Sequence, residues 1–453
     1  MERNLTEGSV FKNIIFFSIP FLISSFLQTL YGLADLFIIG KFCQVEATTA
    51  VSIGSQVMHM LTVMIVGLAM GSTVLIGRAV GSKDKRLRNK AIGNTATIFL
   101  LVSVLLMGML LLFSKNIVAV MSTPKEAVSG TRQYLLVCFA GIPLITAYNI
   151  LSSVFRGMGD SRSPMYFILV ACVCNIGLDY LFIGGLGLGP VGAALGTTLA
   201  QTISVIVAFA AIKRKKMIDG IKRSDFKPDG QIVIMLFKVG IPVSAQDGFI
   251  QISFILITIF ANRRGISDAA AVGIVEKLIG ILFLIPSSLL ASVSALCAQN
   301  IGAGKMDRAK KTLWDAAGIA AGCGMVFAIA FQFLAPAAVG AFTKDGSVVV
   351  LGAQYMRSYV WDCVLAGMHF TFSGYFCACN HSELSFIHNI ISIVTARIPI
   401  AYYASIHYKT TLFPMGMGAP IGSFISVVVC VIAYAWLEKR DKEKKNKEEV
   451  AMP

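Results

Sequence analysis

The stretch that decides the fold is VFKNIIFFSIPFLISSFLQTLYGLADLFIIG, residues 10–40. After Lys12 it carries a single charged side chain, Asp35. A helix that crosses a bilayer needs about 20 apolar residues. This run is longer than the apolar core of a signal peptide, and no small-residue cleavage site follows it. It therefore predicts a first transmembrane helix rather than a cleaved leader.

The composition extends this prediction to the whole chain. Of the 453 residues, 56% are hydrophobic and 14% are charged, and the mean hydropathy is +0.75. Soluble domains carry about 25% charged residues. These values exclude a soluble globular enzyme, a coiled coil and a disordered chain. Because no period-two alternation indicates a barrel, the expected fold class is an all-α polytopic membrane protein.

Breaks at charged residues and at glycine and proline clusters divide the sequence into twelve apolar stretches. With the N-terminus inside, 28 Lys and Arg fall on inside segments and 9 on outside segments, the bias expected of cytoplasmic loops. We therefore expect both termini in the cytoplasm and the chain in the inner (plasma) membrane of the cell. The net charge of +15 then reflects positive loops rather than nucleic-acid binding. The predicted spans are residues 11–39, 50–76, 91–113, 130–154, 164–183, 190–212, 232–261, 270–298, 312–342, 347–376, 383–406 and 412–437.

The two halves of the chain resemble each other at offsets between 221 and 226 residues. Repeats of six spans enter the membrane from the same side, which predicts two pseudo-symmetric bundles with a central cavity and alternating access. The predicted organisation is an N-terminal six-helix bundle (1–212), a cytoplasmic linker (213–231), a C-terminal six-helix bundle (232–437) and a basic cytoplasmic tail (438–453). The matching segments are Ser18–Pro20 with Gly240–Pro242, Arg78–Ser82 with Gln299–Ala303, Gln133-Tyr134 with Gln354-Tyr355, and Gly192–Gly196 with Gly418–Gly422.

Ionisable side chains inside the spans are expected to be functional, because their burial in lipid is costly. Asn175 and Asp179 share one helix face in the fifth span, while Asp35 and Thr197 lie in the first and sixth. Together they predict a cluster of side-chain oxygen atoms that binds a proton or a sodium ion. Two neighbouring carboxylates cannot both stay ionised in a low dielectric without a large electrostatic cost. Two alternatives stay open. Asp35 can be a helix-end residue in contact with water, and Asp179 can cap the glycine-rich segment 184–189.

Further polar residues in the spans are candidates for the cavity lining. Asp362 can line the cavity or face its outer mouth, and Glu276 can pair locally with Lys277. Pro20 removes a backbone hydrogen bond from the first span and is expected to act as a hinge. The five His and ten Cys show no metal-ligand spacing, so no other metal site is expected. The candidate cavity-lining residues are Gln28, Thr198, Gln201, Asp247, Glu276 and Asp362.

Taken in order, several segments resemble the MATE (multidrug and toxic compound extrusion) family, and most closely its DinF-like and MepA-like bacterial branch. The resemblance covers essentially the whole chain and implies twelve helices in two bundles that export organic cations and other toxic compounds by cation coupling. It also implies that Asp35, Asn175, Asp179 and Thr197 form the coupling site. Residues 250–251 are Ile and Gln where the NorM-like branch carries an acid. The segments that carry the resemblance are Pro20 with Asp35, Phe155–Pro164, Asn175–Ile183, Gly192–Thr197 and Ala298–Arg308.

The expected function is multidrug efflux by a secondary antiporter, in which inward H⁺ or Na⁺ drives amphipathic, cationic compounds outwards. No Walker A pattern occurs, so no cofactor is expected beyond the coupling ion, and the chain is not expected to be an enzyme. The alternative is a lipid-linked saccharide flippase of a related fold, which should carry several cations in its spans, whereas only Lys277 and Arg397 qualify. The expected partners are small amphipathic molecules and the lipid bilayer, and the chain is expected to be a monomer.

Overall fold

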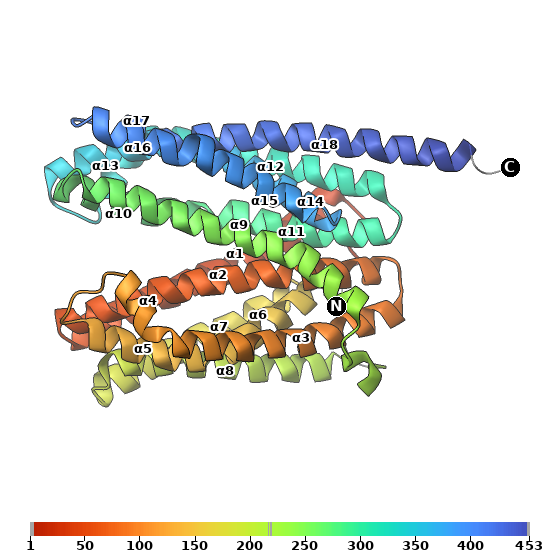
Figure 1. Ribbon diagram of the computed structural model, residues 1–453, viewed down its shortest axis with the longest axis horizontal. Helices are drawn as coiled ribbons and strands as arrows, with labels where there is room; N and C mark the ends of the chain where they lie inside the picture. The colour runs from red at the N-terminus through yellow and green to blue at the C-terminus, as the bar shows by residue number, and fades with distance from the viewer. Residues whose placement is uncertain (1–3, 216, 218–219, 451–453) are drawn as a thin grey trace. The chain divides into compact units, whose positions relative to one another are not determined.

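Every regular element in the structure, a computed structural model that describes residues 4–215, 217 and 220–450, is a helix (Figure 1). The predicted all-α class is therefore confirmed. Elements η1 and η3 are π-helices and η2 is a 3₁₀-helix. The elements are α1 (Val10–Phe42), α2 (Val45–Gly81), α3 (Lys85–Leu112), α4 (Ser114–Val120), α5 (Val128–Ala140), α6 (Ile142–Gly157), α7 (Arg162–Asp179), η1 (Tyr180–Gly185), α8 (Gly189–Arg214), η2 (Arg223–Phe226), α9 (Gly230–Asn262), α10 (Ile266–Leu282), α11 (Leu284–Gly302), α12 (Met306–Gly340), α13 (Gly346–Tyr359), α14 (Asp362–Ala378), α15 (Ser382–Ser392), η3 (Ile393–Arg397), α16 (Ile398–His407), α17 (Phe413–Gly416) and α18 (Gly418–Val450).

Among the described residues, ten helical spans are long and apolar enough to cross a membrane. An eleventh results if α5 and α6, which are bent by 50° relative to each other, count as one. The bend follows from the sequence, because Pro143 in the first turn of α6 has no N–H to continue the hydrogen bonds of α5. The predicted span 347–376 is divided into α13 and α14, so the count of twelve stays a prediction.

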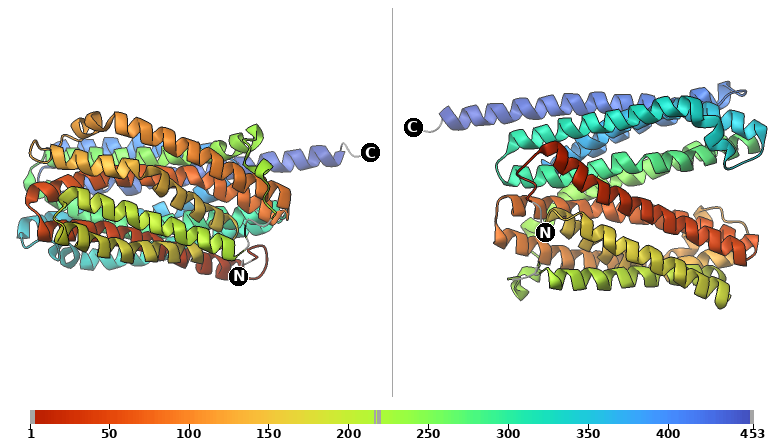
Figure 2. Two further views of the ribbon diagram at one scale, coloured as in Figure 1. Left: turned by 90° about the horizontal axis from the view of Figure 1, so that it is seen from below. Right: turned by 180° about the vertical axis from the view of Figure 1, so that it is seen from behind.

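The chain forms two compact units, which we describe separately. The first contains the described residues up to Ser244 together with Ser294–Thr312, and the second contains Ala245–Val293 and the chain from Leu313 onward. The first unit thus includes the beginning of α9 and the turn between α11 and α12. Figures 1 and 2 show its long helices α2, α3 and α8 running alongside one another.

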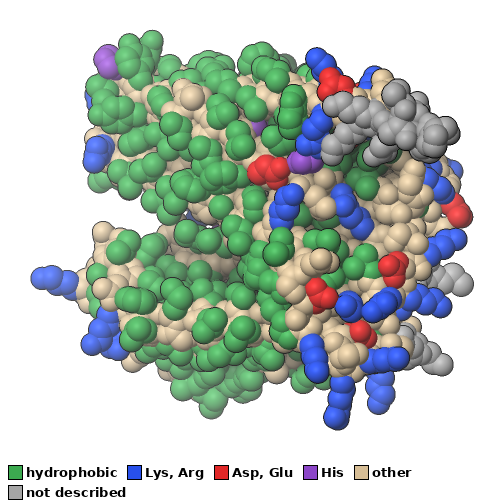
Figure 3. Space-filling view, turned by 45° about the vertical axis from the view of Figure 1, so that its right-hand side comes forward, with side chains coloured by type: hydrophobic (Ala, Val, Ile, Leu, Met, Phe, Trp, Pro, Cys, Tyr) green, Lys and Arg blue, Asp and Glu red, His purple; other side chains and the backbone are tan. Residues whose placement is uncertain are grey.

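The helices of the first unit pack through small and aromatic side chains. In lipid, helices attract each other by close van der Waals packing rather than by the hydrophobic effect, so small residues at the contacts are favoured. Gly54 of α2 is one example, since a methyl group there would overlap the Tyr134 ring of α5. In the lower part of Figure 3, hydrophobic side chains cover the helices and most of the visible Lys and Arg gather at one end. The buried core of this unit includes Ile39, Val51, Ile76, Leu135, Phe139, Phe155 and Ile168.

The second unit has its own apolar core around α10, α12 and α13. At its edge, the Trp314 ring meets the rings of Phe372 and Tyr434 edge-on, an arrangement that aromatic quadrupoles favour. Helix α18 continues from this unit through the predicted tail as far as Val450, and residues 451–453 of that tail lie outside the described residues. The core residues include Ala271, Val275, Ile279, Ala335, Val339, Tyr355 and Met356.

The predicted linker, 213–231, is fastened to α3 of the first unit. Its residues 216, 218 and 219 lie outside the described residues. The Asn94 side chain donates to the Asp225 carbonyl and accepts from the Asp229 N–H. Lys90 Nζ lies 3.0 Å from Asp229 Oδ2, and this hydrogen bond holds the pKa of Asp229 below its ordinary value. The linker is therefore an ordered surface element where it is described.

Candidate functional site

The four residues predicted to bind the coupling ion lie together inside the first unit. Asp35 belongs to α1, Asn175 and Asp179 lie at the end of α7, and Thr197 belongs to α8. Helix α7 packs against both α1 and α8, which brings these side chains to one point. Asp35 exposes 2% of its surface and Asp179 exposes none. Both carboxyl groups are therefore enclosed by protein.

Hydrogen bonds connect the members of this site. Thr197 Oγ1 donates to Asp35 Oδ2 at 3.1 Å, and Asn175 Nδ2 lies 3.5 Å from Asp179 Oδ2. The carboxyl groups of Asp35 and Asp179 are themselves close enough to share a hydrogen bond. Asp179 immediately precedes η1 but makes no side-chain capping bond to it. Its side chain is turned toward the site instead.

The charges of this acidic site are not balanced by a neighbouring cation. In the part of the chain that the structure describes, no Lys, Arg or His forms an ion pair with Asp35 or Asp179. One side-chain oxygen each of Asp35, Asp179 and Asn175 is buried without a hydrogen-bond partner. Buried acceptors usually find a donor, and two touching carboxylates cannot both remain ionised at low cost. The site can therefore take up a proton or another monovalent cation.

Gly196 of α8 completes the site and is a residue that sequence reasoning missed. A methyl group at this position would overlap Asp179 Oδ1 and would lie 3.6 Å from Asn175 Nδ2. Only glycine lets α8 approach the two α7 side chains this closely. The sequence did contain a signal, because Gly196 directly precedes Thr197 and closes the repeated segment Gly192–Gly196.

Polar side chains continue along α1 beyond the acidic site. Gln201 of α8 is buried, and its Nε2 lies 3.4 Å from the hydroxyl of Tyr31, one turn before the site. Farther along α1, the half-buried Gln28 side chain lies near the Tyr148 hydroxyl of α6. Thr198 donates to a carbonyl of its own helix. Of the predicted lining residues in this unit, Gln201 and Gln28 thus extend the polar site along α1. The Thr198 hydroxyl does not, because it donates to the Ala194 carbonyl within α8.

The second unit gathers two of the predicted acids around an arginine. Arg397 Nη2 donates to the Tyr359 hydroxyl at 2.7 Å, and its guanidinium interacts electrostatically with Glu276 and Asp362. Asp247 is placed elsewhere, near Cys377 of α14. The sequence indicates Arg397 only as a cation inside an apolar span, which is itself a sign of function.

Pro20 lies inside α1, which runs unbroken from Val10 to Phe42. The Ser24 hydroxyl donates to the Pro20 carbonyl at 2.8 Å. A proline inside a helix removes one backbone hydrogen bond. The bond from the Ser24 hydroxyl gives the Pro20 carbonyl a side-chain donor in addition to the backbone donors of the helix. The hinge role of Pro20 stays a prediction.

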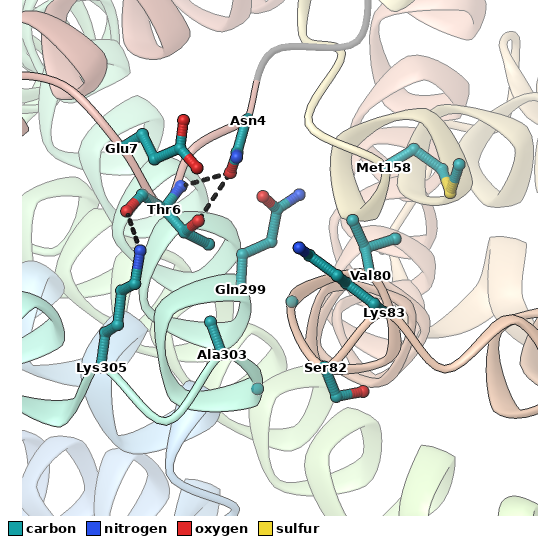
Figure 4. A pocket seen from close by; sticks show the side chains of 12 residues that line it. Asn4, Thr6, Glu7, Val80, Ser82, Lys83, Met158, Gln299, Ala303 and Lys305 are labelled. Atoms are coloured by element: carbon teal, nitrogen blue, oxygen red, sulfur yellow. Dashed lines mark hydrogen bonds between the residues drawn. The ribbon is translucent and has the colours of Figure 1, made fainter.

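An open cavity of about 540 Å³ lies at one end of the first unit (Figure 4). Its wall is formed by the N-terminal segment, the turn between α2 and α3, and the turn between α11 and α12. Lys305 Nζ donates to the Thr6 carbonyl at 2.9 Å, and the Arg308 guanidinium donates to the carbonyls of Glu7 and Gly8. These bonds tie the N-terminal segment to the turn between α11 and α12.

Helices α2 and α11 touch at the same end through two glycines. A methyl group on Gly81 would overlap the Gln299 carbonyl oxygen, and one on Gly302 would overlap the Arg78 carbonyl oxygen. In the sequence, Gly302 follows Gly81 by 221 residues, and Gln299 follows Arg78 by the same interval. The contact is therefore reciprocal between corresponding segments of the two sequence halves, and no larger side chain fits while it is made.

Comparisons with known proteins agree with the repeat in the sequence. The family model described as MatE matches residues 20–181 and, a second time, residues 242–403. The second match starts 222 residues after the first, in agreement with the sequence repeat.

The chain is also similar over most of its length to curated proteins and to solved structures. It is 25% identical over 447 residues to "Probable multidrug resistance protein YoeA" of Bacillus subtilis (strain 168), covering 97% of this chain and 96% of that protein. It is 26% identical over 373 residues to "Multidrug export protein MepA" of Staphylococcus saprophyticus subsp. saprophyticus, covering 81% of each. The crystal structure of MATE in the bent conformation has the same fold, with a TM-score of 0.88 at 24% identity over 98% of each chain.

Proposed function

Because the chain belongs to the MATE family of multidrug and toxic compound extrusion transporters, we propose that it is a cation-coupled antiporter that exports amphipathic, cationic compounds across a bacterial cell membrane. The family is one of multi-pass membrane transporters, and the similar curated proteins are named as multidrug resistance or export proteins rather than enzymes. The coupling ion in this proposal is H⁺ or Na⁺, and the working unit is a monomer.

The observation that carries the proposal is the buried carboxyl pair of Asp35 and Asp179. Without a resident cation, the pair is stable only when it binds a proton or a metal cation from outside. An ion can drive transport only if it binds one access state more tightly than the other. In our proposal, whether this pair holds an ion decides which side of the membrane the binding cavity faces. The ion moves inward in one half of the transport cycle, and the drug moves outward in the other half.

The glycine contact between α2 and α11 supplies a gate for such an alternating-access cycle. The closed end lies beside the Lys-rich turns near the N-terminus, and we propose that this end is cytoplasmic, with both termini on that side. Opening toward the cytoplasm would then separate Gly81 from Gln299, and Gly302 from Arg78.

Gly81→Val should keep this end open, because with the larger side chain α2 and α11 cannot re-form the contact. Increased labelling of a cysteine introduced at Ser82 would support this gate, and labelling equal to that of a Gly108→Val control would contradict it.

Transport by purified protein in vesicles tests the proposed function directly. Export of a permanently cationic dye should accelerate when either a pH gradient or a sodium gradient is imposed, and should return to the passive rate when the gradient is collapsed. A rate independent of both gradients would contradict coupling.

Pro20→Ala should slow gradient-driven export while leaving expression intact, because a continuous helix lacks the proposed hinge. Unchanged export by this variant would remove Pro20 from the mechanism.

The alternative of a lipid-linked saccharide flippase is not favoured. Holding a pyrophosphate inside the membrane calls for several cationic side chains, and in the second unit the buried polar cluster contains one, Arg397, which two acids accompany. The names of the similar curated proteins also refer to drugs rather than to saccharides.

A further inference from the structure

The N-terminal segment is attached to the rest of the first unit mainly through its backbone. Four consecutive carbonyls, those of residues 5–8, accept hydrogen bonds from side chains of α11, α12 and the turn between them. We call these four residues the N-terminal strap. The Leu5 side chain is 1% exposed, so apolar burial anchors the strap as well. The hydrogen bonds run from Asn300 to Leu5, from Lys305 to Thr6, and from Arg308 to Glu7 and Gly8.

Arg308 makes the strongest of these attachments. Its Nη1 donates to the Gly8 carbonyl at 2.8 Å, and its Nη2 donates to the Glu7 carbonyl at 2.7 Å. The planar guanidinium presents two N–H groups in a fixed fork, and hydrogen bonds from a charged donor are stronger than neutral ones. Asn13, in the first turn of α1, donates to the same Glu7 carbonyl at 2.9 Å. The strap therefore connects the start of α12 directly with the start of α1.

The three donors are specific to the second half of the sequence repeat. The residues 221 positions earlier are Ala79, Asp84 and Leu87. Ala and Leu side chains cannot donate a hydrogen bond, and an ionised carboxylate can only accept one. Asp84 indeed accepts from the Leu87 N–H and so caps α3. The turn itself therefore does not require these donors, and their presence in the second half is explained by the strap that they bind.

The segment that leads into the second half is attached in the reciprocal way. Residues 227–230 lie 222 positions after the strap, and the linker that contains them is fastened to α3, the helix that corresponds to α12. Besides the bonds of Lys90 and Asn94, the Thr97 hydroxyl donates to the Phe226 carbonyl at 2.8 Å. A methyl group on Gly93 would overlap the Asp225 carbonyl oxygen. The segment before each half is thus held by the other half.

The strap lies at the same end of the first unit as the glycine contact between α2 and α11. Asn300 stands between Gln299 and Gly302, the two α11 residues of that contact, and α1 packs against α2. Moving α11 away from α2 therefore pulls the donors away from the strap carbonyls. On its other side the strap borders the open cavity of about 540 Å³, which separates it from the turn between α2 and α3 (Figure 4). The strap can therefore leave its donors without a clash on that side.

We propose that the N-terminal strap locks this end of the transporter shut and must separate from Asn300, Lys305 and Arg308 before the end can open. This inference rests on the proposed alternating-access cycle and names the element that stabilises its closed state. Arg308 is then a positioning residue, which acts through the strap and not on the transported compound. Because the donors bind main-chain carbonyls, the strap should tolerate changes of its exposed side chains.

The labelling rate of a buried cysteine measures how often this end opens. Ala298 of α11 is fully buried, and a methyl group on Gly77 of α2 would lie 3.1 Å from its Cβ. In the purified full-length protein carrying Ala298→Cys, a maleimide should react only while α2 and α11 are apart, so its rate follows the open fraction. Arg308→Gln should raise this rate about tenfold, the low end for hydrogen bonds to a charged group, because Arg308 is half-buried.

Two matched variants and the parent protein serve as controls. Glu7→Gln changes an exposed carboxylate of the strap but keeps the carbonyl that Arg308 binds. Arg86→Gln removes an exposed arginine from the start of α3, as Arg308→Gln does from the start of α12. Both should label within about twofold of the unaltered strap. The ten native cysteines, labelled in the parent without the Ala298 substitution, report any general loosening of the fold.

Each outcome of this experiment decides the proposal. A selective rise in Arg308→Gln supports the lock, whereas an unchanged rate overturns it. A rise that Arg86→Gln or the native cysteines share also overturns it, because the whole fold has then loosened. If Arg308→Gln does not fold, Arg308→Lys keeps the charge but loses the fork. About threefold faster labelling is then expected, and an unchanged rate overturns the proposal. A selective rise without gradient-driven export would contradict the proposed antiport and leave the lock standing.

Discussion

The two units bury polar clusters of opposite design at similar places in their folds. In the first, Asp179 is the residue before the π-helix η1 and faces a second acid, Asp35. In the second, Arg397 is the last residue of the π-helix η3 and two acids accompany it. The first cluster needs a cation from outside to balance its charge, whereas the second contains its own. On this difference we base the proposal that ion uptake takes place in the first unit rather than in the second.

The largest effect is expected from the acids of the first unit. Asp35→Asn and Asp179→Asn each leave one carboxyl, which no longer needs to share a proton with its neighbour. Gradient-driven accumulation of a cationic dye should fall to passive distribution in each variant, because the ion no longer distinguishes the access states. Vesicle transport under an imposed gradient measures this, with Asp315→Asn of α12 as an expression-matched control. Export at the wild-type rate in both variants would remove the acidic pair as the coupling site.

A smaller but still severe effect is expected at Gly196. A methyl group there overlaps Asp179 Oδ1, so the carboxyl must move or α8 must shift. Overpacking of this kind costs about 1–3 kcal/mol, which corresponds to roughly 5- to 150-fold if it falls on ion binding. Dye export at limiting ion concentration should fall by that factor in Gly196→Ala. Gly177→Ala is the control on α7, because a methyl group there meets nothing within 4 Å. Equal behaviour of the two variants would show that close packing at Asp179 is not required.

The acids of the second unit provide the contrasting case. Because Arg397 already supplies positive charge to that cluster, neutralising Glu276 or Asp362 should not abolish ion uptake. Glu276→Gln and Asp362→Asn should keep gradient-driven export of a cationic dye within about threefold of wild type, a difference below 1 kcal/mol. The same vesicle assay measures it beside the Asp35 variant. Complete loss in either variant would mean that the second unit also couples to the ion, and the division of labour between the units would be wrong.

The sequence predicted the members of the acidic pair better than their surroundings. Asp35 and Asp179 stand out because charges are rare in apolar spans, and the spacing of Asn175 and Asp179 places them on one helix face. The repeated segment Gly192–Gly196 drew attention to Gly196, but its contact with Asp179 could not be predicted, because it depends on how α7 and α8 pack. Likewise, the spans could be recognised from hydropathy, but the breaks inside 130–154 and 347–376 could not be inferred from apolar length alone. Arg397 was visible as a charge, yet its neighbours come from distant segments and only the fold brings them together.

The smallest effect is expected from Asp160, a residue between α6 and α7 that lies outside the acidic pair. Its carboxylate accepts hydrogen bonds from Lys215 and from the Ser163 hydroxyl and backbone N–H. Burial alone would raise the pKa of Asp160, but these hydrogen bonds hold it below its ordinary value of 3.8. A carboxyl with a lowered pKa stabilises the fold above its unfolded-state pKa, and this contribution disappears as the pH falls through the lower folded-state value.

Asp160→Asn should therefore destabilise the protein by about 1–2 kcal/mol at neutral pH, the usual value of hydrogen bonds to a charged group, and leave ion coupling unchanged. Thermal unfolding in detergent at several pH values measures this, and the difference from wild type should shrink as the pH falls below 3.8. Asp84→Asn is the control, because that carboxylate caps α3 by a bond to the Leu87 N–H, which asparagine can replace. If Asp160→Asn also lost gradient-driven export, polar groups outside the buried pair would take part in coupling, and the contrast between the two units would not be enough to locate ion uptake.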